Sequence, residues 1–171
     1  MGGKARRAAV ALRAIKAIAL DVDGVLTDGS VWWGPNGEEW KRFSFADIMG
    51  ISLAQKAGFR VALVSGEASP LVDRYAAKMA ITDVEKGCKD KGAALRAIAE
   101  RHDLSPSDFC FMGDDVNDLS AMELAGLAAA PADARPAVIE QVAFVAKRNG
   151  GNGAVRELID ALLAARATAR K

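Results

Sequence analysis

The sequence predicts a single α/β domain over residues 1–171, built on a doubly wound parallel sheet. Short apolar runs alternate with longer segments of helical pattern, which is typical of a parallel sheet with helices on both faces. The runs are continuously apolar rather than alternating in polarity, as expected for strands covered on both faces. The sequence contains no internal repeat, low-complexity block or linker, so one hydrophobic core accounts for the chain.

Each element follows from its local pattern. Five apolar runs predict strands: Ala17–Leu20, Arg60–Val64, Phe109–Met112, Leu127–Ala130 and Val142–Val145. Five longer segments predict helices: Ile48–Ala57, Pro70–Met79, Lys91–Arg101, Asp118–Ala125 and Pro136–Glu140. Ser69 before Pro70, and Asp90, supply helix starts, whereas Gly58 and Gly126 mark helix ends. The later segment 154–166 carries an apolar stripe that predicts a packing face.

A hairpin flap, at about residues 29–45, interrupts this alternation. Ser30–Trp33 and Glu38–Phe43 flank Gly34-Pro35-Asn36-Gly37, whose composition is typical of a hairpin turn. The flap carries every tryptophan of the chain: Trp32, Trp33 and Trp40. Core packing is one explanation, but a two-stranded ribbon has little core of its own. We therefore expect these side chains to be buried against another subunit or over the active site, and the first case predicts a closed homo-oligomer.

Bulk properties exclude several classes of protein. The net charge is +1 and the basic residues do not gather on one element, so nothing indicates nucleic-acid binding. Cys88 and Cys110 form neither a CxxC pair nor a disulfide framework. No apolar run approaches the ~20 residues that span a bilayer, and the basic first sixteen residues do not resemble a signal peptide. We expect a cytoplasmic protein without membrane contact.

Two carboxylates follow the first predicted strand. Asp21 and Asp23 lie two positions apart in an extended segment, so their side chains point to the same side, at the carboxyl end of the sheet where open α/β folds build their sites. Two such charges close together need a cation or a shared proton. Gly24 then allows a sharp change of direction. Taken alone, the pair is equally consistent with solvated loop carboxylates.

Three further groups of polar residues stand at strand ends or helix starts. The strand ending at Met112 runs into Gly113-Asp114-Asp115-Val116-Asn117-Asp118, and clustered acids suit a hard cation such as Mg²⁺. The strand ending at Val64 runs into Ser65-Gly66-Glu67, which offers a hydroxyl and backbone donors to phosphate. Lys91 begins a predicted helix and supplies a positive charge.

Together these segments resemble the four motifs of the haloacid dehalogenase superfamily. The matching stretches are D-x-D-G-V-x-T-D at residues 21–28, Ser65-Gly66, Asp90-Lys91 and G-D-D-x-x-D at residues 113–118. Their order separates the chain from phosphorelay receiver domains, in which the acidic pair comes first. The resemblance implies a HAD-like Rossmannoid sheet with the hairpin flap and no cap domain.

The resemblance also implies a Mg²⁺-dependent phosphomonoesterase that works through an aspartyl-phosphate. Asp21 would be the nucleophile and Asp23 the general acid and base, which requires a raised pKa. Ser65 and Lys91 would neutralise the transferring phosphoryl group. Lys91 is preferred over two neighbouring lysines, at 86 and 89, because it matches the D-K pattern of the family.

The metal would be held by carboxylates from two of these motifs. The resemblance assigns Mg²⁺ to the Asp21 carboxylate, the backbone carbonyl of Asp23 and Asp114. Asp118 lies one helical turn after Asp114 and would orient either the metal-bound waters or Lys91. Asp115 has two readings of equal weight, a supporting role in the site or a loop acid that lends only charge.

The chain further resembles the capless 3-deoxy-ulosonate phosphate phosphatases. The shared stretches are T-D-G at residues 27–29, G-E-E-W-K-R-F at 37–43, Asp47 with Gly50-Ile51, and G-G-N-G-A-V-R-E at 150–157. This resemblance implies a phosphorylated sugar acid as substrate and a homotetramer, formed through the tryptophan hairpin, in which a neighbouring subunit closes the site. It also makes Asp47 a candidate substrate-binding residue, although relatives usually carry a small residue where this chain has Ile48.

Glu67 guides the choice of substrate. Octulosonate phosphatases typically have arginine at this place after the hydroxyl-glycine step, whereas Glu67 with Lys78 is similar to the nonulosonate branch. We therefore expect Gly66, Glu67 and Lys78 to bind a nonulosonate 9-phosphate of the KDN or sialic-acid type. The alternative substrate is 3-deoxy-D-manno-octulosonate 8-phosphate, and the alternative for Glu67 and Lys78 is a surface ion pair of little energetic value.

Three other functions remain open from the sequence. A catalytically silent regulatory domain would keep the fold without the activity, although all four motifs are intact. A phosphotransferase would use the same aspartyl-phosphate, but the missing cap disfavours it. A capless phosphatase acting on phosphoprotein is expected to be a monomer, so the state of assembly separates it from an enzyme for small molecules.

Overall fold

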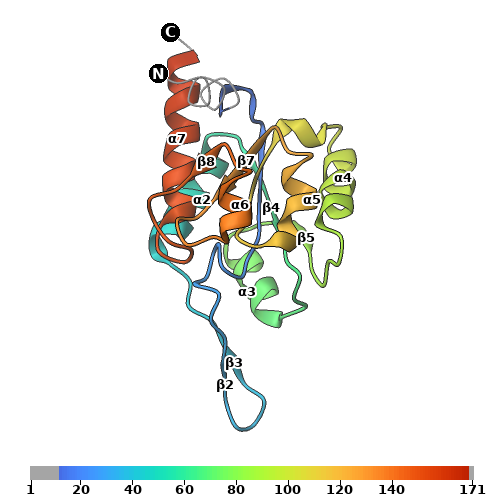
Figure 1. Ribbon diagram of the computed structural model, residues 1–171, viewed down its shortest axis with the longest axis vertical. Coiled ribbons are helices and arrows are strands. Elements are labelled where there is room, and N and C mark those ends of the chain that lie inside the picture. The colour runs from blue at the N-terminus through green and yellow to red at the C-terminus, as the bar shows by residue number, and fades with distance from the viewer. Residues whose placement is uncertain (1–11, 170–171) are drawn as a thin grey trace.

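The computed structural model describes residues 12–169 and centres on one six-stranded parallel sheet (Figure 1). Its order is β5-β4-β1-β6-β7-β8, with β1 at Ala17–Leu20 between β4 and β6. The remaining strands of the sheet are β4 (Arg60–Val64), β5 (Asp83–Glu85), β6 (Phe109–Met112), β7 (Leu127–Ala130) and β8 (Phe144–Val145). This confirms the doubly wound parallel sheet that the alternation of elements predicted.

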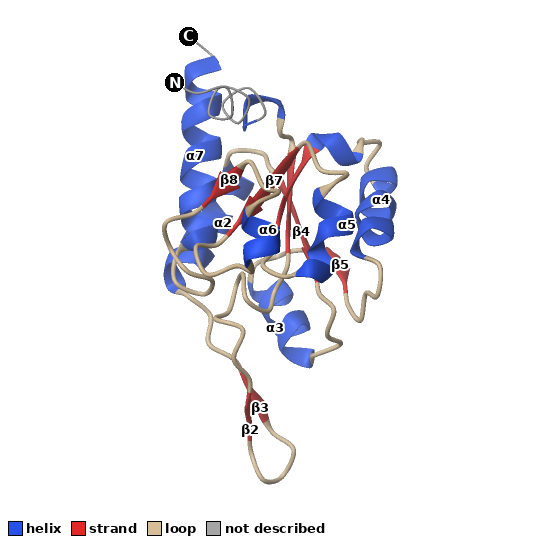
Figure 2. Cartoon of the chain, viewed as in Figure 1, coloured by secondary structure: helices blue, strands red, loops and turns tan. Residues whose placement is uncertain are grey.

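Helices cover both faces of the sheet (Figure 2). They are α2 (Phe45–Lys56), α3 (Pro70–Lys78), α4 (Lys91–Arg101), α5 (Leu119–Met122), α6 (Pro136–Ile139) and α7 (Ala154–Ala169), with 3₁₀ turns η1 (Pro106–Asp108) and η2 (Val116–Asp118). Side chains of α2, α3 and α7 belong to one buried apolar cluster, and those of α4, α5 and α6 belong to the other. The segment with the apolar stripe is α7, whose buried side chains pack in the first cluster.

The boundaries of several elements differ from the sequence expectation. The helix expected from Ile48 begins at Phe45, because the Ser44 hydroxyl accepts the N–H of Ala46 and caps the helix there. The helix expected at 118–125 is a 3₁₀ turn followed by the short α5. The last strand is shortened to two residues. The pattern missed β5 because this edge strand has only three residues, two of them acidic.

The hairpin flap projects from the body of the protein (Figure 1). Its paired strands are β2 (Trp32–Trp33) and β3 (Glu39–Trp40), with Trp32 opposite Trp40. Gly37 has φ +88°, a left-handed conformation that glycine adopts without strain in the turn. Among the described residues, nothing buries the three tryptophans, which remain 53–76% exposed. The fold of one chain therefore does not account for these aromatic side chains.

Within residues 12–169, we find no helix that is both long and apolar enough to span a membrane.

Candidate active site

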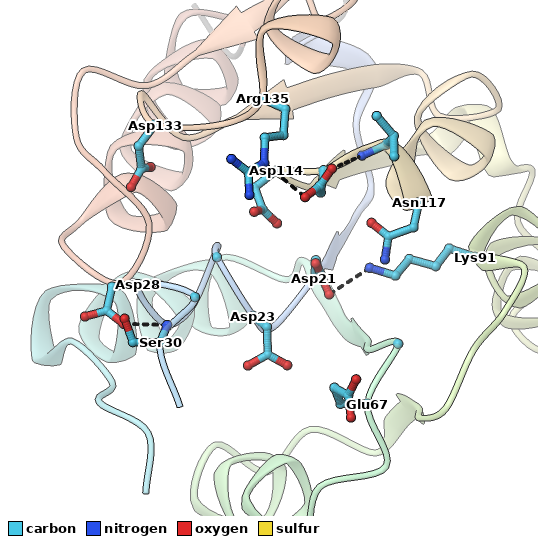
Figure 3. A pocket seen from close by; sticks show the side chains of 15 residues that line it. Asp21, Asp23, Asp28, Ser30, Glu67, Lys91, Asp114, Asn117, Asp133 and Arg135 are labelled. Carbon is cyan, nitrogen blue, oxygen red and sulfur yellow. Dashed lines mark hydrogen bonds and ion pairs between the residues drawn. The ribbon is translucent and has the colours of Figure 1, made fainter. Parts of the chain in front are cut away.

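A polar pocket of about 670 Å³ lies at the carboxyl ends of the central strands. Its volume falls within the usual range for a small-molecule site. It is lined by side chains and backbone from five segments of the chain, namely Asp21, Asp23, Gly24, Asp28, Gly29, Ser30, Gly66, Glu67, Lys91, Asp114, Asp115, Val116, Asn117, Asp133 and Arg135 (Figure 3). The structure thus brings together all four sequence motifs at the place that parallel-sheet topology predicts.

Asp21 is the most buried acid at the floor of this pocket. It directly follows β1, and its backbone N–H donates to the Met112 carbonyl at 2.9 Å, which continues the β1–β6 ladder. Its carboxylate accepts the N–H of Val22 at 2.7 Å and contacts Lys91 Nζ at 2.9 Å. The residue is 4% exposed, so one carboxylate oxygen is fixed by donors from the protein.

Lys91 is fixed between two carboxylates. It is the first residue of α4, a helix that Asp90 caps by accepting the N–H of Ala93 at 3.0 Å. Its Nζ lies 2.9 Å from Asp21 Oδ1 and 2.6 Å from Asp118 Oδ1. Burial by itself would lower the pKa of Lys91, but the two carboxylates outweigh it and raise the pKa above its ordinary value. Lys91 is therefore a permanent, buried positive charge.

Asp118 orients both the lysine and the acidic loop. One carboxylate oxygen accepts from Lys91, and the other accepts the backbone N–H groups of Asp114 and Asp115 at 2.9 and 3.2 Å. Of the two roles expected for Asp118, orientation of Lys91 is the one visible in these contacts. Because both oxygens of Asp118 already accept hydrogen bonds, its carboxylate has little freedom to move toward a ligand.

Gly24 makes room for Asp114. The glycine has φ +87°, and a Cβ atom placed on it would lie 2.2 Å from Asp114 Oδ2. Any other residue at this position would collide with the carboxylate and adopt a strained backbone. Gly24 therefore allows the first motif to lie close to the acidic loop that carries Asp114, in addition to turning the chain.

Asp21, Asp114 and Asp118 form a cluster whose carboxylate oxygens lie within 4.8 Å of one another. Burial and the nearby Asp118 raise the pKa of Asp21 to about 8, against the opposing effect of Lys91. Burial, Asp118 and Asp115 raise the pKa of Asp114 to about 6. Three carboxylates share one lysine, so the cluster carries excess negative charge that a divalent cation would offset. Hard oxygen donors of this kind suit Mg²⁺.

Asp23 lies outside that cluster and faces the hairpin. Its carboxylate contacts Lys41 Nζ at 2.8 Å, and the Lys41 side chain is only 4% exposed. Lys41 also lies 3.6 Å from Glu39, which accepts a hydrogen bond from the Ser69 hydroxyl at 2.7 Å. These contacts join the base of the hairpin to the active site. The Asp23–Lys41 pair could not be predicted from the sequence, because the two residues belong to different elements.

The loop after β4 contributes backbone and one acid to the pocket. Ser65 is fully buried, and its hydroxyl accepts the N–H of Glu67 at 3.1 Å. Gly66 and Glu67 line the pocket, and Figure 3 shows Glu67 on the same side of it as Asp23. Lys78 does not join them. It lies at the last residue of the nine-residue α3, about 13 Å along the helix from its start, and lines a separate groove beside Trp40.

Asp47 also lies outside the pocket, contrary to its predicted role in binding substrate. It is fully buried, and its carboxylate accepts the backbone N–H groups of Gly153 and Arg156 at 3.1 and 2.9 Å. Burial raises the pKa of Asp47, and these two hydrogen bonds oppose the shift. The side chain satisfies the free N–H groups at the start of α7, so its role in this structure is to connect α2 to α7.

The sequence did not indicate Asp133 or Arg135 as pocket residues, and it left the role of Asp115 open. Asp115, left open there, pairs through its carboxylate with Arg135 Nε at 3.1 Å and accepts the N–H of Val116 at 2.7 Å. Asp133 lines the pocket as well and accepts the N–H of Gly150 at 2.9 Å. Arg135 and Asp133 follow β7, the next strand after the acidic loop, and their position at a strand end is the only signal that pointed to them.

Comparison with known proteins agrees with this geometry. The model of the haloacid dehalogenase-like hydrolases matches residues 72–158. The chain is 40% identical over 151 residues to the 3-deoxy-D-manno-octulosonate 8-phosphate phosphatase KdsC of Escherichia coli strain K12, which covers 88% of this chain and 80% of the relative. It also resembles the solved structure of the Yersinia pestis phosphatase of that name, with TM-score 0.92, 32% identity, and coverage of 96% and 89% of the two chains.

A third relative was solved with ligands. The corresponding phosphatase of Moraxella catarrhalis, in complex with a magnesium ion, a phosphate ion and a KDO molecule, matches with TM-score 0.92 and 30% identity, over 95% of this chain and 94% of the other. The family expected from the four motifs is thereby confirmed. The chain belongs to the haloacid dehalogenase-like hydrolases and, among them, to the phosphatases of the KdsC type.

Proposed function

We propose that this phosphatase hydrolyses 3-deoxy-D-manno-octulosonate 8-phosphate with Mg²⁺ as its cofactor. The observation that carries the proposal is the 40% identity to the Escherichia coli octulosonate phosphatase over 88% of the chain. The pocket supports it, because an open polar cavity of about 670 Å³ has room for a phosphorylated sugar acid. The acidic cluster beneath the pocket supplies the oxygen ligands that Mg²⁺ prefers.

This proposal replaces the nine-carbon substrate that the sequence favoured. That preference depended on Glu67 and Lys78 acting together on the sugar. In the structure Glu67 lines the active-site pocket, whereas Lys78 lines the groove beside Trp40, so one chain does not form the pair. The relatives named above favour the eight-carbon sugar acid. Glu67 remains the residue in this pocket at which we expect preference between the two substrates to change.

In the first half of the proposed reaction, a carboxylate oxygen of Asp21 attacks phosphorus while the bond from phosphorus to the sugar oxygen breaks. Lys91 and Ser65 bind the phosphoryl oxygens, and Asp118 positions Lys91 for that contact. Asp23 gives a proton to the departing sugar oxygen. Asp21, Asp114 and the Asp23 carbonyl would hold Mg²⁺, which would supply positive charge to offset the repulsion between nucleophile and phosphate.

In the second half, water hydrolyses the aspartyl-phosphate. Asp23 takes a proton from the water, whose oxygen attacks phosphorus as the bond to Asp21 breaks, and inorganic phosphate leaves. The contact of Asp23 with Lys41 Nζ at 2.8 Å holds the carboxylate in place beside the pocket.

We further propose that the enzyme is a cytoplasmic homotetramer whose contacts include the hairpin. Six apolar side chains on and beside the hairpin are 38–80% exposed, namely Val31, Trp32, Trp33, Trp40, Phe45 and Met49. Beside them lies a groove of about 330 Å³ with a stacked aromatic pair, Phe43 and Tyr75, at 4.5 Å between ring centroids. The Tyr75 hydroxyl is buried without a hydrogen-bond partner among the described residues. An exposed apolar surface of this kind is typical of subunit contacts.

The proposal is tested by phosphate release from a panel of substrates. The panel contains octulosonate 8-phosphate, a nonulosonate 9-phosphate and para-nitrophenyl phosphate, each assayed with Mg²⁺ and again after chelation. We expect kcat/KM to be highest for the eight-carbon acid and activity to disappear on chelation and return with Mg²⁺. A higher kcat/KM for the nine-carbon acid would overturn the substrate assignment, and no release from any ester would support the regulatory alternative.

Glu67→Arg, assayed on the same panel, tests the role of that residue. Because Glu67 lines the pocket and carries the charge opposite to arginine, we expect the variant to change the ratio of kcat/KM between the eight- and nine-carbon acids. An unchanged ratio contradicts a role for Glu67 in substrate choice.

A further inference from the structure

The charges that line the active-site pocket are strongly unequal. Its acidic members are Asp21, Asp23, Asp28, Glu67, Asp114, Asp115 and Asp133. Its basic members are Lys91 and Arg135. The Lys91 side chain is 1% exposed and is held by two carboxylates, whereas the Arg135 side chain is 68% exposed. Arg135 is therefore the exposed cation among the described residues that line the pocket.

The Arg135 guanidinium is held at one end and open at the other. Its Nε donates to Asp115 Oδ2 at 3.1 Å, and among the described residues the terminal nitrogens Nη1 and Nη2 have no hydrogen-bond partner. Figure 3 shows the guanidinium directed into the pocket, above Asp114 and between Asp133 and Asn117. The two terminal nitrogens of arginine form a planar fork that matches the two oxygens of a carboxylate.

The backbone places this side chain with little freedom. The N–H of Arg135 donates to the Asp114 carbonyl at 2.8 Å, so the residue is tied to the acidic loop. Pro136 follows at the first position of α6 and fixes the backbone there. Asp115 accepts the N–H of Val116 and so is itself held in place. A donor that is positioned before the ligand arrives loses less entropy on binding.

A phosphorylated sugar acid brings two anionic groups to this pocket, a phosphate at one end and a carboxylate at the other. Lys91 and the acidic cluster with its cation serve the phosphate, and a second carboxylate in so acidic a pocket would be repelled unless a cation met it. We infer that Arg135 binds the carboxylate of the sugar acid through Nη1 and Nη2, and that Asp115 is the residue that positions it. This inference rests on the proposed function and makes Arg135 a determinant of specificity.

The test compares a phosphate ester that carries a carboxylate with one that lacks a carboxylate. One is the sugar-acid phosphate, eight- or nine-carbon, that the native enzyme hydrolyses best, and the other is a pentose 5-phosphate, which lacks a carboxylate. For each enzyme the ratio of their kcat/KM values is measured. In Arg135→Gln we expect this ratio to fall about 10- to 100-fold, the scale of a lost hydrogen bond to a charged group. The fall in the ratio should come chiefly from a higher KM for the sugar-acid phosphate.

Two variants sharpen the measurement. Arg135→Lys keeps the charge without the fork and should restore part of the ratio. Arg42 is the matched control. Like Arg135, it pairs with a pocket aspartate, because its Nη2 lies 3.6 Å from Asp28 Oδ2, and its side chain is 55% exposed. Unlike Arg135, it does not line the pocket. We expect the ratio in Arg42→Gln to fall less than threefold. Thermal unfolding of each variant checks that the fold is intact.

The outcomes separate this inference from the proposed function. If the native enzyme hydrolyses the pentose phosphate as well as either sugar acid, the proposed function fails and the inference with it. If the native enzyme prefers the sugar acid but Arg135→Gln keeps the native ratio, the proposed function stands and the inference is overturned. An equal loss of kcat/KM for both esters in Arg135→Gln also overturns the inference. Arg135 would then act by holding the Asp114 loop rather than by binding the carboxylate.

Discussion

The acidic site and the hairpin flap differ in how far a single chain satisfies their side chains. At the site, Asp21, Lys91 and Asp118 are nearly inaccessible, and the lysine contacts both carboxylates within the same chain. On the flap, Trp32 and Trp33 are 69% and 76% exposed, and the paired strands are only two residues long. One chain therefore buries the charged residues of the site, whereas it leaves the aromatic side chains of the flap exposed.

Lys41 is where these two regions meet. It belongs to the segment that returns from the flap, yet its ammonium group is buried against Asp23. A shift of the flap would therefore move a contact of the residue that we propose as general acid and base. The contact between Lys41 and Asp23 therefore links the position of the flap to the geometry of the site.

The largest effect is expected from Asp21→Asn. The amide has the shape of the carboxylate but cannot form the aspartyl-phosphate, so we expect kcat to fall by about 10⁴-fold or more, the scale for loss of a nucleophile. Asp160→Asn, on the exposed side of α7, is the matched control and should retain native activity. Phosphate release measures both. More than about one per cent residual activity in Asp21→Asn would contradict the role of nucleophile.

The same substitution should stabilise the protein when no metal is bound. Asp21 is one of three clustered carboxylates, and burial together with the charge of Asp118 makes its ionised form unfavourable. Asparagine removes that charge at the same volume. In the presence of a chelator, we expect Asp21→Asn to unfold at a higher temperature than the native protein in a thermal scan. A lower unfolding temperature would contradict this account of the cluster.

Lys41→Met tests the link between flap and site. Methionine fills similar volume but cannot contact Asp23, so the carboxylate loses its partner at 2.8 Å. We expect kcat to fall about 10- to 100-fold, as for a misplaced catalytic group. Lys56→Met, at the exposed end of α2, is the control. An unchanged kcat would show that the flap and the site are independent.

Trp32→Ser tests the flap itself. Loss of a tryptophan from the centre of a subunit contact commonly costs about 2 kcal/mol or more, so we expect the assembly to dissociate at protein concentrations at which the native tetramer persists. Sedimentation velocity measures the change. Val145→Ser, an exposed apolar residue on the edge strand β8, is the control. A native protein that sediments as a monomer would overturn the tetramer and favour a macromolecular substrate.

The smallest effect is expected from Asp47→Ala, which leaves two backbone N–H groups at the start of α7 without their acceptor. An unsatisfied buried donor costs about 1–3 kcal/mol, and each kcal/mol lowers the unfolding temperature of a chain of this size by about 2–4 °C. Thermal unfolding should show this decrease, with Glu100→Ala on the exposed side of α4 as control. An unchanged unfolding temperature would return Asp47 to the candidates for substrate binding.

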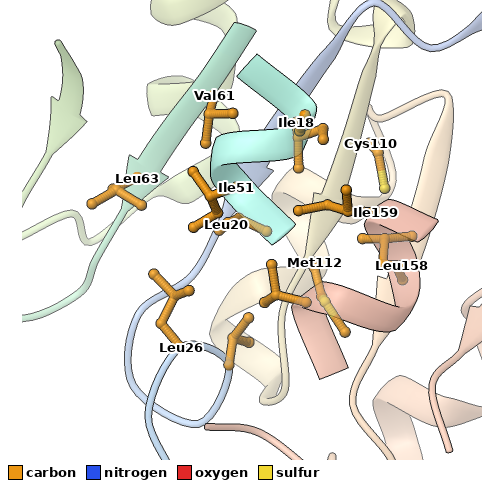
Figure 4. Close-up of a cluster of buried hydrophobic side chains, with 14 of the residues drawn as sticks. Ile18, Leu20, Leu26, Ile51, Val61, Leu63, Cys110, Met112, Leu158 and Ile159 are labelled. Carbon is orange, nitrogen blue, oxygen red and sulfur yellow. The ribbon is translucent and has the colours of Figure 1, made fainter. Parts of the chain in front are cut away.

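The parallel sheet and the four motifs of the site could be predicted from local sequence patterns. In β1, the side chains of Ile18 and Leu20 enter one apolar cluster (Figure 4), and those of Ala17 and Ala19 enter the other. A continuous apolar run predicts this burial on both faces. Since parallel strands end at one edge of the sheet, acids that follow β1 and β6 had to meet. Local pattern and topology were sufficient for Asp21 and its neighbours.

Contacts between side chains that lie far apart in the sequence could be found only in the folded chain. Asp47 accepts a hydrogen bond from a residue 106 positions later, and the pairing of Asp115 with Arg135 spans 20 positions. The separation of Lys78 from Glu67 follows from the direction of α3, which no residue type reveals. Secondary structure reflects interactions between near neighbours, and these contacts depend on how whole elements pack. For that reason the sequence was sufficient to propose Asp21 as the nucleophile, and the structure was needed to find Arg135.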